Sequence, residues 1–99
     1  MTAFDLTRAA QDDLKAIARQ TQAQWGQLQR NRYLHEMDQL FGSLAGNPAM
    51  GRACDEVRAG YRKFPHGGHV IYYQQLAGYG ILIVRILHAS MDANTQLDA

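Results

Sequence analysis

Four basic side chains and one histidine have the clearest capacity for chemistry in this 99-residue sequence. They are Arg58, Arg62, Lys63, Arg85 and His88, and no acidic residue occurs anywhere between positions 57 and 90. Guanidinium and ammonium groups bind carboxylates and phosphates, and a histidine can transfer protons near neutral pH. The set could therefore bind an acidic protein segment or a nucleic acid, or it could act on a phosphodiester.

Arg85 is unusual because it interrupts the apolar run from Ile81 to His88. A guanidinium without a partner in a dry interior would be very costly, so Arg85 should reach water, a carboxylate or another molecule. Two interpretations follow. Arg85 contacts a binding partner, or it is a structural residue that pairs with a carboxylate such as Asp92 or the C-terminus.

His88 could serve as a general acid or base only if it met the arginines on one phosphate. Strand alternation places Ile81, Ile83, Arg85 and Leu87 on one face and sends His88 to the other. We therefore predict a structural histidine and no catalytic residue. His66 and His69 lack the spacing of a metal site, so neither a metal nor a cofactor is expected.

The elements that must position these residues begin with a strand from Ala3 to Leu6. Thr7 has the chemistry of a helix N-cap, and Gly26 separates two helices, one ending at Trp25 and one spanning Gln27 to Ala45. Such a short connection predicts an antiparallel hairpin. Apolar residues recur at helical spacing and should form the core: Ala10, Leu14, Ile17 and Trp25 in the first helix, and Tyr33, Met37, Leu40, Phe41 and Leu44 in the second.

After Pro48 the pattern changes to strands. We expect a loop over Ala49 to Glu56, a turn at residues 65–68 and a frayed end from Asn94 to Ala99. The expected strands are Val57 to Phe64, His69 to Leu76 and Gly80 to His88. The fold class is therefore α+β, with an N-terminal strand and a helical hairpin packed on a small antiparallel sheet, in one domain covering residues 1–99. If Arg58 and Arg62 share the face of Arg85, they form a basic groove with an apolar floor.

Composition narrows the functional classes. The net charge is only +1, which argues against a protein devoted to binding nucleic-acid phosphates. No apolar run approaches the roughly 20 residues that span a bilayer, and the N-terminus lacks the pattern of a signal peptide. Cys54 is the only cysteine, so no intramolecular disulfide can form. We expect a cytoplasmic protein that does not interact with membranes.

The order of the short motifs resembles the ParE toxins of type II toxin–antitoxin modules, within the RelE/ParE superfamily. The motifs follow one another along nearly the whole chain: Leu6-Thr7, Asp13-Leu14, Trp25-Gly26, Asn47-Pro48, Gly51-Arg52, Val57 to Arg62, Gly68 to Tyr73 and Val84 to Asp92. The resemblance implies a helical hairpin on an antiparallel sheet. It also implies a toxin that poisons DNA gyrase so that cleaved DNA accumulates, and that a ParD-like antitoxin neutralises.

On this interpretation the protein is not an enzyme, and no direct sequence-specific binding to nucleic acid is expected. Arg58, Arg62, Lys63, Arg85 and His88 would contact the antitoxin or gyrase. One alternative is a RelE-like ribosome-dependent mRNA endoribonuclease, in which the three arginines bind phosphate and His88 transfers a proton. A second alternative is a partner-binding module without toxicity.

Overall fold

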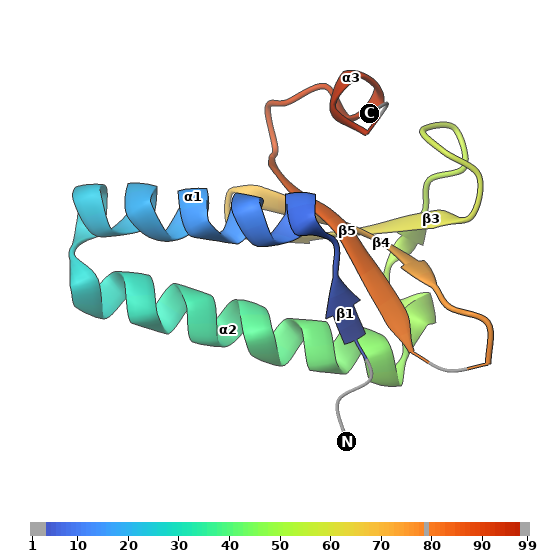
Figure 1. Ribbon diagram of the computed structural model, residues 1–99, viewed down its shortest axis with the longest axis horizontal. Coiled ribbons are helices and arrows are strands. Elements are labelled where there is room, and N and C mark those ends of the chain that lie inside the picture. The colour runs from blue at the N-terminus through green and yellow to red at the C-terminus, as the bar shows by residue number, and fades with distance from the viewer. Residues whose placement is uncertain (1–3, 79, 98–99) are drawn as a thin grey trace.

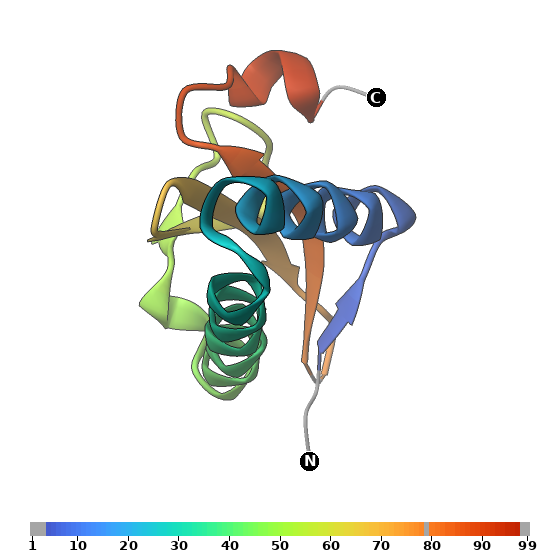
Figure 2. The ribbon, with the colours of Figure 1, turned by 90° about the vertical axis from the view of Figure 1, so that its left-hand side faces the viewer.

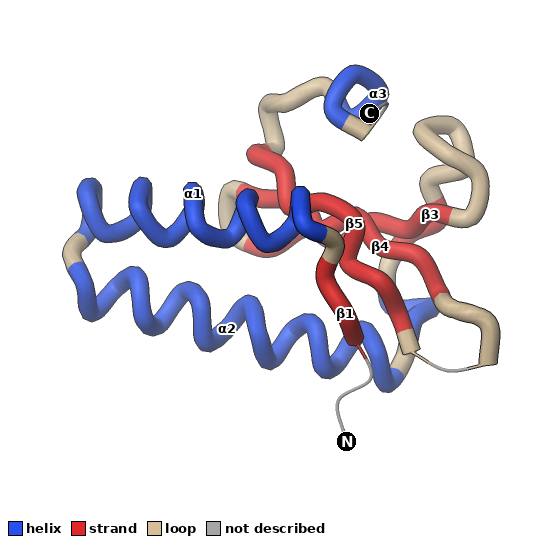
Figure 3. Tube along the Cα trace, in the orientation of Figure 1, coloured by secondary structure: helices blue, strands red, loops and turns tan. Residues whose placement is uncertain are grey.

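The computed structural model describes residues 4–78 and 80–97. A hairpin of two long helices lies against a five-stranded sheet (Figures 1 and 3). The elements, in chain order, are β1 (Phe4–Leu6), α1 (Arg8–Trp25), α2 (Gln27–Gly46), the 3-10 turn η1 (Pro48–Met50), β2 (Arg52–Ala53), β3 (Tyr61–His66), β4 (His69–Gln75), β5 (Ile81–His88) and α3 (Ala93–Gln96).

The helical hairpin forms as its end signals predict. The Thr7 hydroxyl accepts a 3.0 Å hydrogen bond from the Ala10 amide and so caps α1. Gly26 ends α1 and precedes α2 with φ of 91°, a backbone angle that glycine adopts without strain. The two helices then run antiparallel, one above the other in Figure 1.

The sheet has the order β1-β5-β4-β3-β2. Consecutive strands from β2 to β5 pair antiparallel, as the short connections predict, whereas β1 pairs parallel with β5. A parallel neighbour is possible because the whole helical hairpin and three further strands separate β1 from β5 in sequence. The α+β class is confirmed, and the sheet is mixed through this one parallel pair.

The strand expected from Val57 to Phe64 begins later in the structure than the sequence predicts. Residues 57–60 lie in turns instead, where Asp55 Oδ1 accepts a 2.8 Å hydrogen bond from the Gly60 amide and Gly60 has φ of 85°. The strand β3 starts at Tyr61 and continues to His66, so the turn expected at 65–68 is limited to the last two of those residues. The expected loop from Ala49 to Glu56 also contains η1 and the short strand β2.

Alternation along β4 separates two apolar clusters. Ile71 and Tyr73 face the helical hairpin, whereas Tyr72 faces the opposite side of the sheet. The main cluster lies under the hairpin and buries Ala10, Ile17, Met37, Phe41, Leu44, Ile71, Tyr73, Ile81, Ile83 and Ile86. The second cluster buries Cys54, Tyr72, Leu87, Ala93 and Leu97. The predicted helical stripe is therefore core, with one exception.

The exception is Trp25, whose side chain is 67% exposed. The prediction that it belongs to the core is wrong because Trp25 lies in the last turn of α1, at the joined end of the hairpin, and this end extends beyond the sheet (Figure 1).

The C-terminal segment is also more ordered than expected. Asp92 caps the short helix α3 by accepting a 3.0 Å hydrogen bond from the Asn94 amide, and Ala93 and Leu97 are buried in the second cluster. Figure 2 shows α3 on the side of α1 away from α2. The prediction of a frayed end fails for residues 94–97, while Asp98, Ala99 and the expected strand residue Ala3 lie outside the described residues. None of the described helices is long and apolar enough to cross a membrane.

Candidate functional site

A bulge in β5 decides where Arg85 points. Tyr72 pairs with Arg85, but the next residue of β4, Tyr73, pairs with Ile83, so Val84 is the extra residue. The bulge reverses the alternation, so that Ile83 faces the helical hairpin and Arg85 faces the other side of the sheet. The prediction that Ile81, Ile83, Arg85 and Leu87 share one face is therefore wrong.

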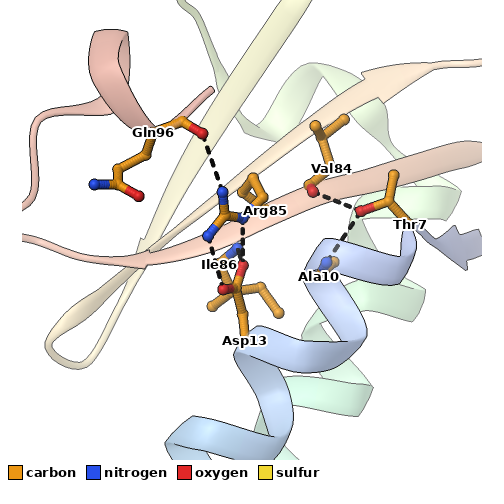
Figure 4. A network of polar contacts seen from close by, with 7 residues as sticks. All are labelled: Thr7, Ala10, Asp13, Val84, Arg85, Ile86 and Gln96. Carbon is orange, nitrogen blue, oxygen red and sulfur yellow. Dashed lines mark hydrogen bonds and ion pairs between the residues drawn. The ribbon is translucent and has the colours of Figure 1, made fainter. Parts of the chain in front are cut away.

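Asp13 of α1 is the partner of Arg85. Its Oδ2 accepts a 2.8 Å hydrogen bond from Nε of Arg85, and its Oδ1 accepts one of 3.0 Å from Nη2 (Figure 4). This hydrogen bonding raises the pKa of Arg85, although burial opposes the shift, so the guanidinium stays charged. The expected pairing with Asp92 or the C-terminus is not the one seen, because the Asp92 carboxylate caps α3.

The same helix also completes the hydrogen bonding at the edge of β5. The strand β1 ends at Leu6, and beyond it the Val84 carbonyl accepts a 2.7 Å hydrogen bond from the Thr7 hydroxyl. The Ile86 amide donates a 2.9 Å hydrogen bond to Asp13 Oδ2. Figure 4 shows both contacts. The side chains of Asp13 in α1 and of the N-cap residue Thr7 thus replace the strand partner that the bulged part of β5 lacks.

Arg58 and Arg85 meet beneath the C-terminal helix. Arg58 Nη2 donates a 2.9 Å hydrogen bond to the Leu97 carbonyl, and Arg85 Nη1 donates one of 3.0 Å to the Gln96 carbonyl. Between them is a pocket of about 230 Å³, which we call the arginine pocket; it is lined by Thr7, Ala9, Arg58, Tyr61, Val84, Arg85, Gln96 and Leu97. The lining combines the two guanidinium groups with the apolar side chains of Val84 and Leu97.

Lys63 lies on the same face of the sheet. Tyr72 is the pairing partner of Lys63 on β3 and of Arg85 on β5, and directly paired residues point to one side. Lys63, Tyr72 and Arg85 therefore form one row across the sheet. Of the expected groove of Arg58, Arg62 and Arg85, the structure brings Arg58 and Arg85 together. It adds Lys63, which alternation along the expected strand had placed on the face opposite Arg58.

Arg62 does not join this surface. It pairs with Tyr73, which belongs to the cluster under the hairpin, and its Nη1 donates a 2.7 Å hydrogen bond to the Gly51 carbonyl. The Tyr73 hydroxyl meets the same segment, accepting from the Gly51 amide at 2.9 Å and donating to the Pro48 carbonyl at 2.6 Å. The expectation that Arg62 shares the face of Arg85 is wrong, because Arg62 supports the chain around η1.

His88 lies on the opposite face from Arg85, as alternation predicts. Its Nδ1 accepts a 3.2 Å hydrogen bond from the Ser90 amide and lies 2.7 Å from the Ser90 hydroxyl, and its ring packs edge-on against His69. The structure therefore does not bring His88 together with Arg58 and Arg85 on one phosphate. Within the described part of the chain, no group of three or more His, Cys, Asp or Glu residues could hold a metal ion.

Sequence reasoning missed Asp13 as a site residue, although a signal was present. Asp13 follows Ala10 by three residues and precedes Ile17 by four, so it lies on the buried face of α1. A carboxylate at such a position requires a buried partner. Arg85 was the matching cation in an apolar strand.

Comparison with known proteins adds family information to this geometry. Residues 4–93 match the family described as ParE toxin of type II toxin-antitoxin system, parDE. The chain is 41% identical over 92 residues to Toxin ParE1 of Mycobacterium tuberculosis, covering 93% of this chain and 94% of the relative. It is 35% identical over 97 residues to Toxin ParE1 of Caulobacter vibrioides, covering 98% and 99% of the two chains.

A solved structure has a similar fold. It is described as a chromosomal ParDE TA system from P. aeruginosa, and it superposes with a TM-score of 0.72 over 89% of this chain and 96% of the other. At 20% sequence identity, this similarity concerns the fold alone.

Proposed function

Because this chain belongs to the ParE family of toxins of type II toxin–antitoxin systems, we propose that it binds DNA gyrase and stalls the enzyme while its DNA is cleaved. On this proposal the whole chain is one toxin domain that works in the cytoplasm, where a ParD-like antitoxin neutralises it. The toxin acts by occupying its target and contributes no catalytic residue of its own.

The separation of Arg85 from His88 carries the non-enzymatic part of the proposal. Cleavage of RNA by the endoribonuclease mechanism needs a cation on the phosphate and a titratable group within hydrogen-bond reach of it. Here Arg58 and Arg85 meet on one face of the sheet, whereas His88 ends on the other. A toxin that acts by binding needs no such convergence.

The arginine pocket supports the antitoxin part of the proposal. Arg58 and Arg85 donate to backbone carbonyls at its rim while Asp13 pairs with the Arg85 guanidinium, and Lys63 adds a positive charge on the same face. The apolar side chains of Tyr61, Val84 and Leu97 lie between these cations. An amphipathic segment with carboxylates beside apolar residues would match this pattern. Arg62 and His88 lie on the other face of the sheet. They would contact gyrase or the antitoxin only if that partner also extended onto this second face.

The decisive experiment exposes two targets to the purified chain in parallel. One reaction holds gyrase and supercoiled plasmid, and the other holds translating ribosomes with a defined mRNA. We expect gyrase-linked DNA breaks without mRNA cleavage, and addition of a ParD-like antitoxin should abolish them. Cleavage of mRNA without DNA breaks would contradict this proposal and favour the RelE-like endoribonuclease. If the protein binds the antitoxin tightly but causes neither DNA breaks nor mRNA cleavage, it is the partner-binding module without toxicity.

A matched pair of variants tests the surface. Replacing Arg58 with Ala should weaken antitoxin binding, and the loss should shrink as salt rises because the contact is electrostatic. The control is Arg32→Ala, which removes an exposed arginine from α2 instead. Equal affinity of the two variants for the antitoxin would remove Arg58 from the contact surface.

A further inference from the structure

A groove separate from the arginine pocket lies at the other end of the hairpin. It has a volume of about 440 Å³ and lies between the last turns of α1, the first turns of α2 and the place where β4 begins and β5 ends. We call it the hairpin groove. Two aromatic side chains, Trp25 and Tyr33, and two imidazoles, His69 and His88, line it together with the amide side chains of Gln24 and Gln29.

The lining of the hairpin groove is polar without being charged. Among the described residues that line it there is no Asp, Glu, Lys or Arg. Burial and the neighbouring imidazoles of His88 and His66 lower the pKa of His69, which favours its neutral form at neutral pH. A group that binds here is therefore recognised by hydrogen bonds and by packing on rings, and not by its charge.

The hydrogen bonds around the two imidazoles define their tautomers. The Ser90 amide donates to His88 Nδ1, so the proton of neutral His88 lies on Nε2. The Tyr33 hydroxyl donates to the His66 carbonyl at 3.0 Å, so it accepts from His69 Nδ1 at 2.8 Å and leaves His69 Nε2 as an acceptor. No described residue forms a hydrogen bond with either Nε2 atom.

The groove is thus lined by one imidazole with a donor and one with an acceptor, and the centroids of the two rings lie 5.8 Å apart. Trp25 lines the groove and is two thirds exposed. The volume lies within the range of about 300–1,000 Å³ typical of small-ligand sites.

We propose that the hairpin groove binds a nucleobase. A nucleobase is planar and uncharged, it carries donors and acceptors on one edge, and it stacks on exposed aromatic rings. Trp25 provides the surface on which the base stacks. The Nε2 atoms of His69 and His88 and the side-chain amides of Gln24 and Gln29 form hydrogen bonds with the donors and acceptors on the edge of the base. The base could come from a free nucleoside or from a single strand of nucleic acid. This site is independent of the proposed gyrase poisoning, which does not require it.

The chain supplies its own reporter, because Trp25 is its only tryptophan. We would titrate the full-length protein with adenosine and with cytidine while recording tryptophan fluorescence. Saturable quenching by at least one nucleoside is expected, and ribose 5-phosphate should have no effect. The absence of saturable quenching by either nucleoside, or equal quenching by ribose 5-phosphate, would overturn the proposal.

Two variants separate binding in the groove from simple stacking on an exposed ring. His88→Ala removes the Nε2 donor from an exposed position and should weaken nucleoside binding about fivefold, the effect of one lost hydrogen bond. His35→Ala is the matched control, since His35 is exposed on α2 and does not line the groove. Identical affinities for the two variants would contradict a role for the imidazoles.

Imidazole nitrogen spectra of the wild-type protein provide a measurement that needs no variant. The bound nucleoside should shift the Nε2 resonances of His69 and His88 and leave those of His35 in place. A short oligothymidine in high salt identifies the source of the base. Binding much tighter than that of thymidine indicates a nucleic-acid strand, and equal binding indicates a free nucleoside. Unshifted His69 and His88 resonances at saturating nucleoside would overturn the proposal.

Discussion

Asp13 and Arg85 lie 72 positions apart in the sequence, yet the Asp13 carboxylate accepts two hydrogen bonds, of 2.8 and 3.0 Å, from the Arg85 guanidinium. The side chains are only 15% and 20% exposed. The pair joins α1 to the bulge of β5 and aims the remaining N–H groups of Arg85 at the C-terminal helix. One ion pair therefore connects the hairpin core to the arginine pocket.

Asp13→Asn should lower the free energy of unfolding by about 2 kcal/mol. Removing one partner of a largely buried ion pair typically costs 3–5 kcal/mol, and the residual exposure and the retained amide reduce that value. Urea denaturation measures the change. The control is Asp12→Asn, because the Asp12 side chain is 60% exposed and its ion pair with Arg8 should contribute about 0.5 kcal/mol or less. Similar losses in both variants would contradict the importance of the buried pair.

Gly51→Ala should destabilise the protein by roughly 2 kcal/mol, the typical cost of overpacking a tight site. A Cβ atom at this position would collide with the buried Tyr73 hydroxyl, which the Pro48 carbonyl and the Gly51 amide hold in place. Gly42→Ala is the matched control, because Gly42 lies within α2 and a Cβ atom there would have nothing within 4 Å. Thermal unfolding of the control should show unchanged or higher stability, since alanine is the better helix former.

The Cys54 thiol should react slowly with iodoacetamide in the folded protein. It is fully buried in the second cluster, and burial raises its pKa, so the reactive thiolate is scarce. Leu97→Ala should accelerate alkylation about tenfold, because a loss of roughly 1.4 kcal/mol in α3 packing makes local opening that much more frequent. Mass spectrometry of timed samples gives the rate. Met91→Ala, at an exposed position before α3, should leave it unchanged.

Stability should decrease as the pH falls below about 6.5, in part because of His69. Burial, and then the nearby His88 and His66, lower its pKa in the folded state, while Asp13 opposes this shift. As the pH falls, His69 is therefore protonated in the unfolded chain before it is protonated in the folded protein. The loss of stability grows until the pH reaches the pKa of His69 in the folded state. Urea midpoints at about pH 7.5 and pH 5.5 should differ less in His69→Gln than in the wild type. His35→Gln should retain the full wild-type difference.

Trp25→Gln should change the free energy of unfolding by no more than about 0.5 kcal/mol, as expected for an exposed position. The same result is expected for Leu28→Gln, whose leucine is 85% exposed. Chemical denaturation followed by circular dichroism measures both without relying on tryptophan. A loss as large as that from Phe41→Ala, which empties a core position, would mean that Trp25 is packed after all.

Much of the fold follows from local patterns. Thr7 as an N-cap, Gly26 as the break between the helices and the stripe that includes Met37 and Phe41 were all predictable, because capping and helical periodicity depend on neighbouring residues. The positions of β4 and β5 follow from their β-branched and aromatic residues.

The site depended on contacts between distant residues. Simple alternation placed Arg85 among isoleucines, but the bulge at Val84 turned it to the other face. That bulge forms where β5 pairs with β4 on one side and meets Thr7 and Asp13, the N-cap and a residue of α1, on the other, so nothing within the strand reveals it. Local patterns were therefore enough to predict the helices, most of the strands and the presence of a charged group that needed a partner. The folded chain was needed to show that the partner is Asp13, that Arg62 faces away, and that Arg58 and Arg85 meet beneath α3. Those choices arise from packing between elements far apart in the chain, which no local pattern encodes.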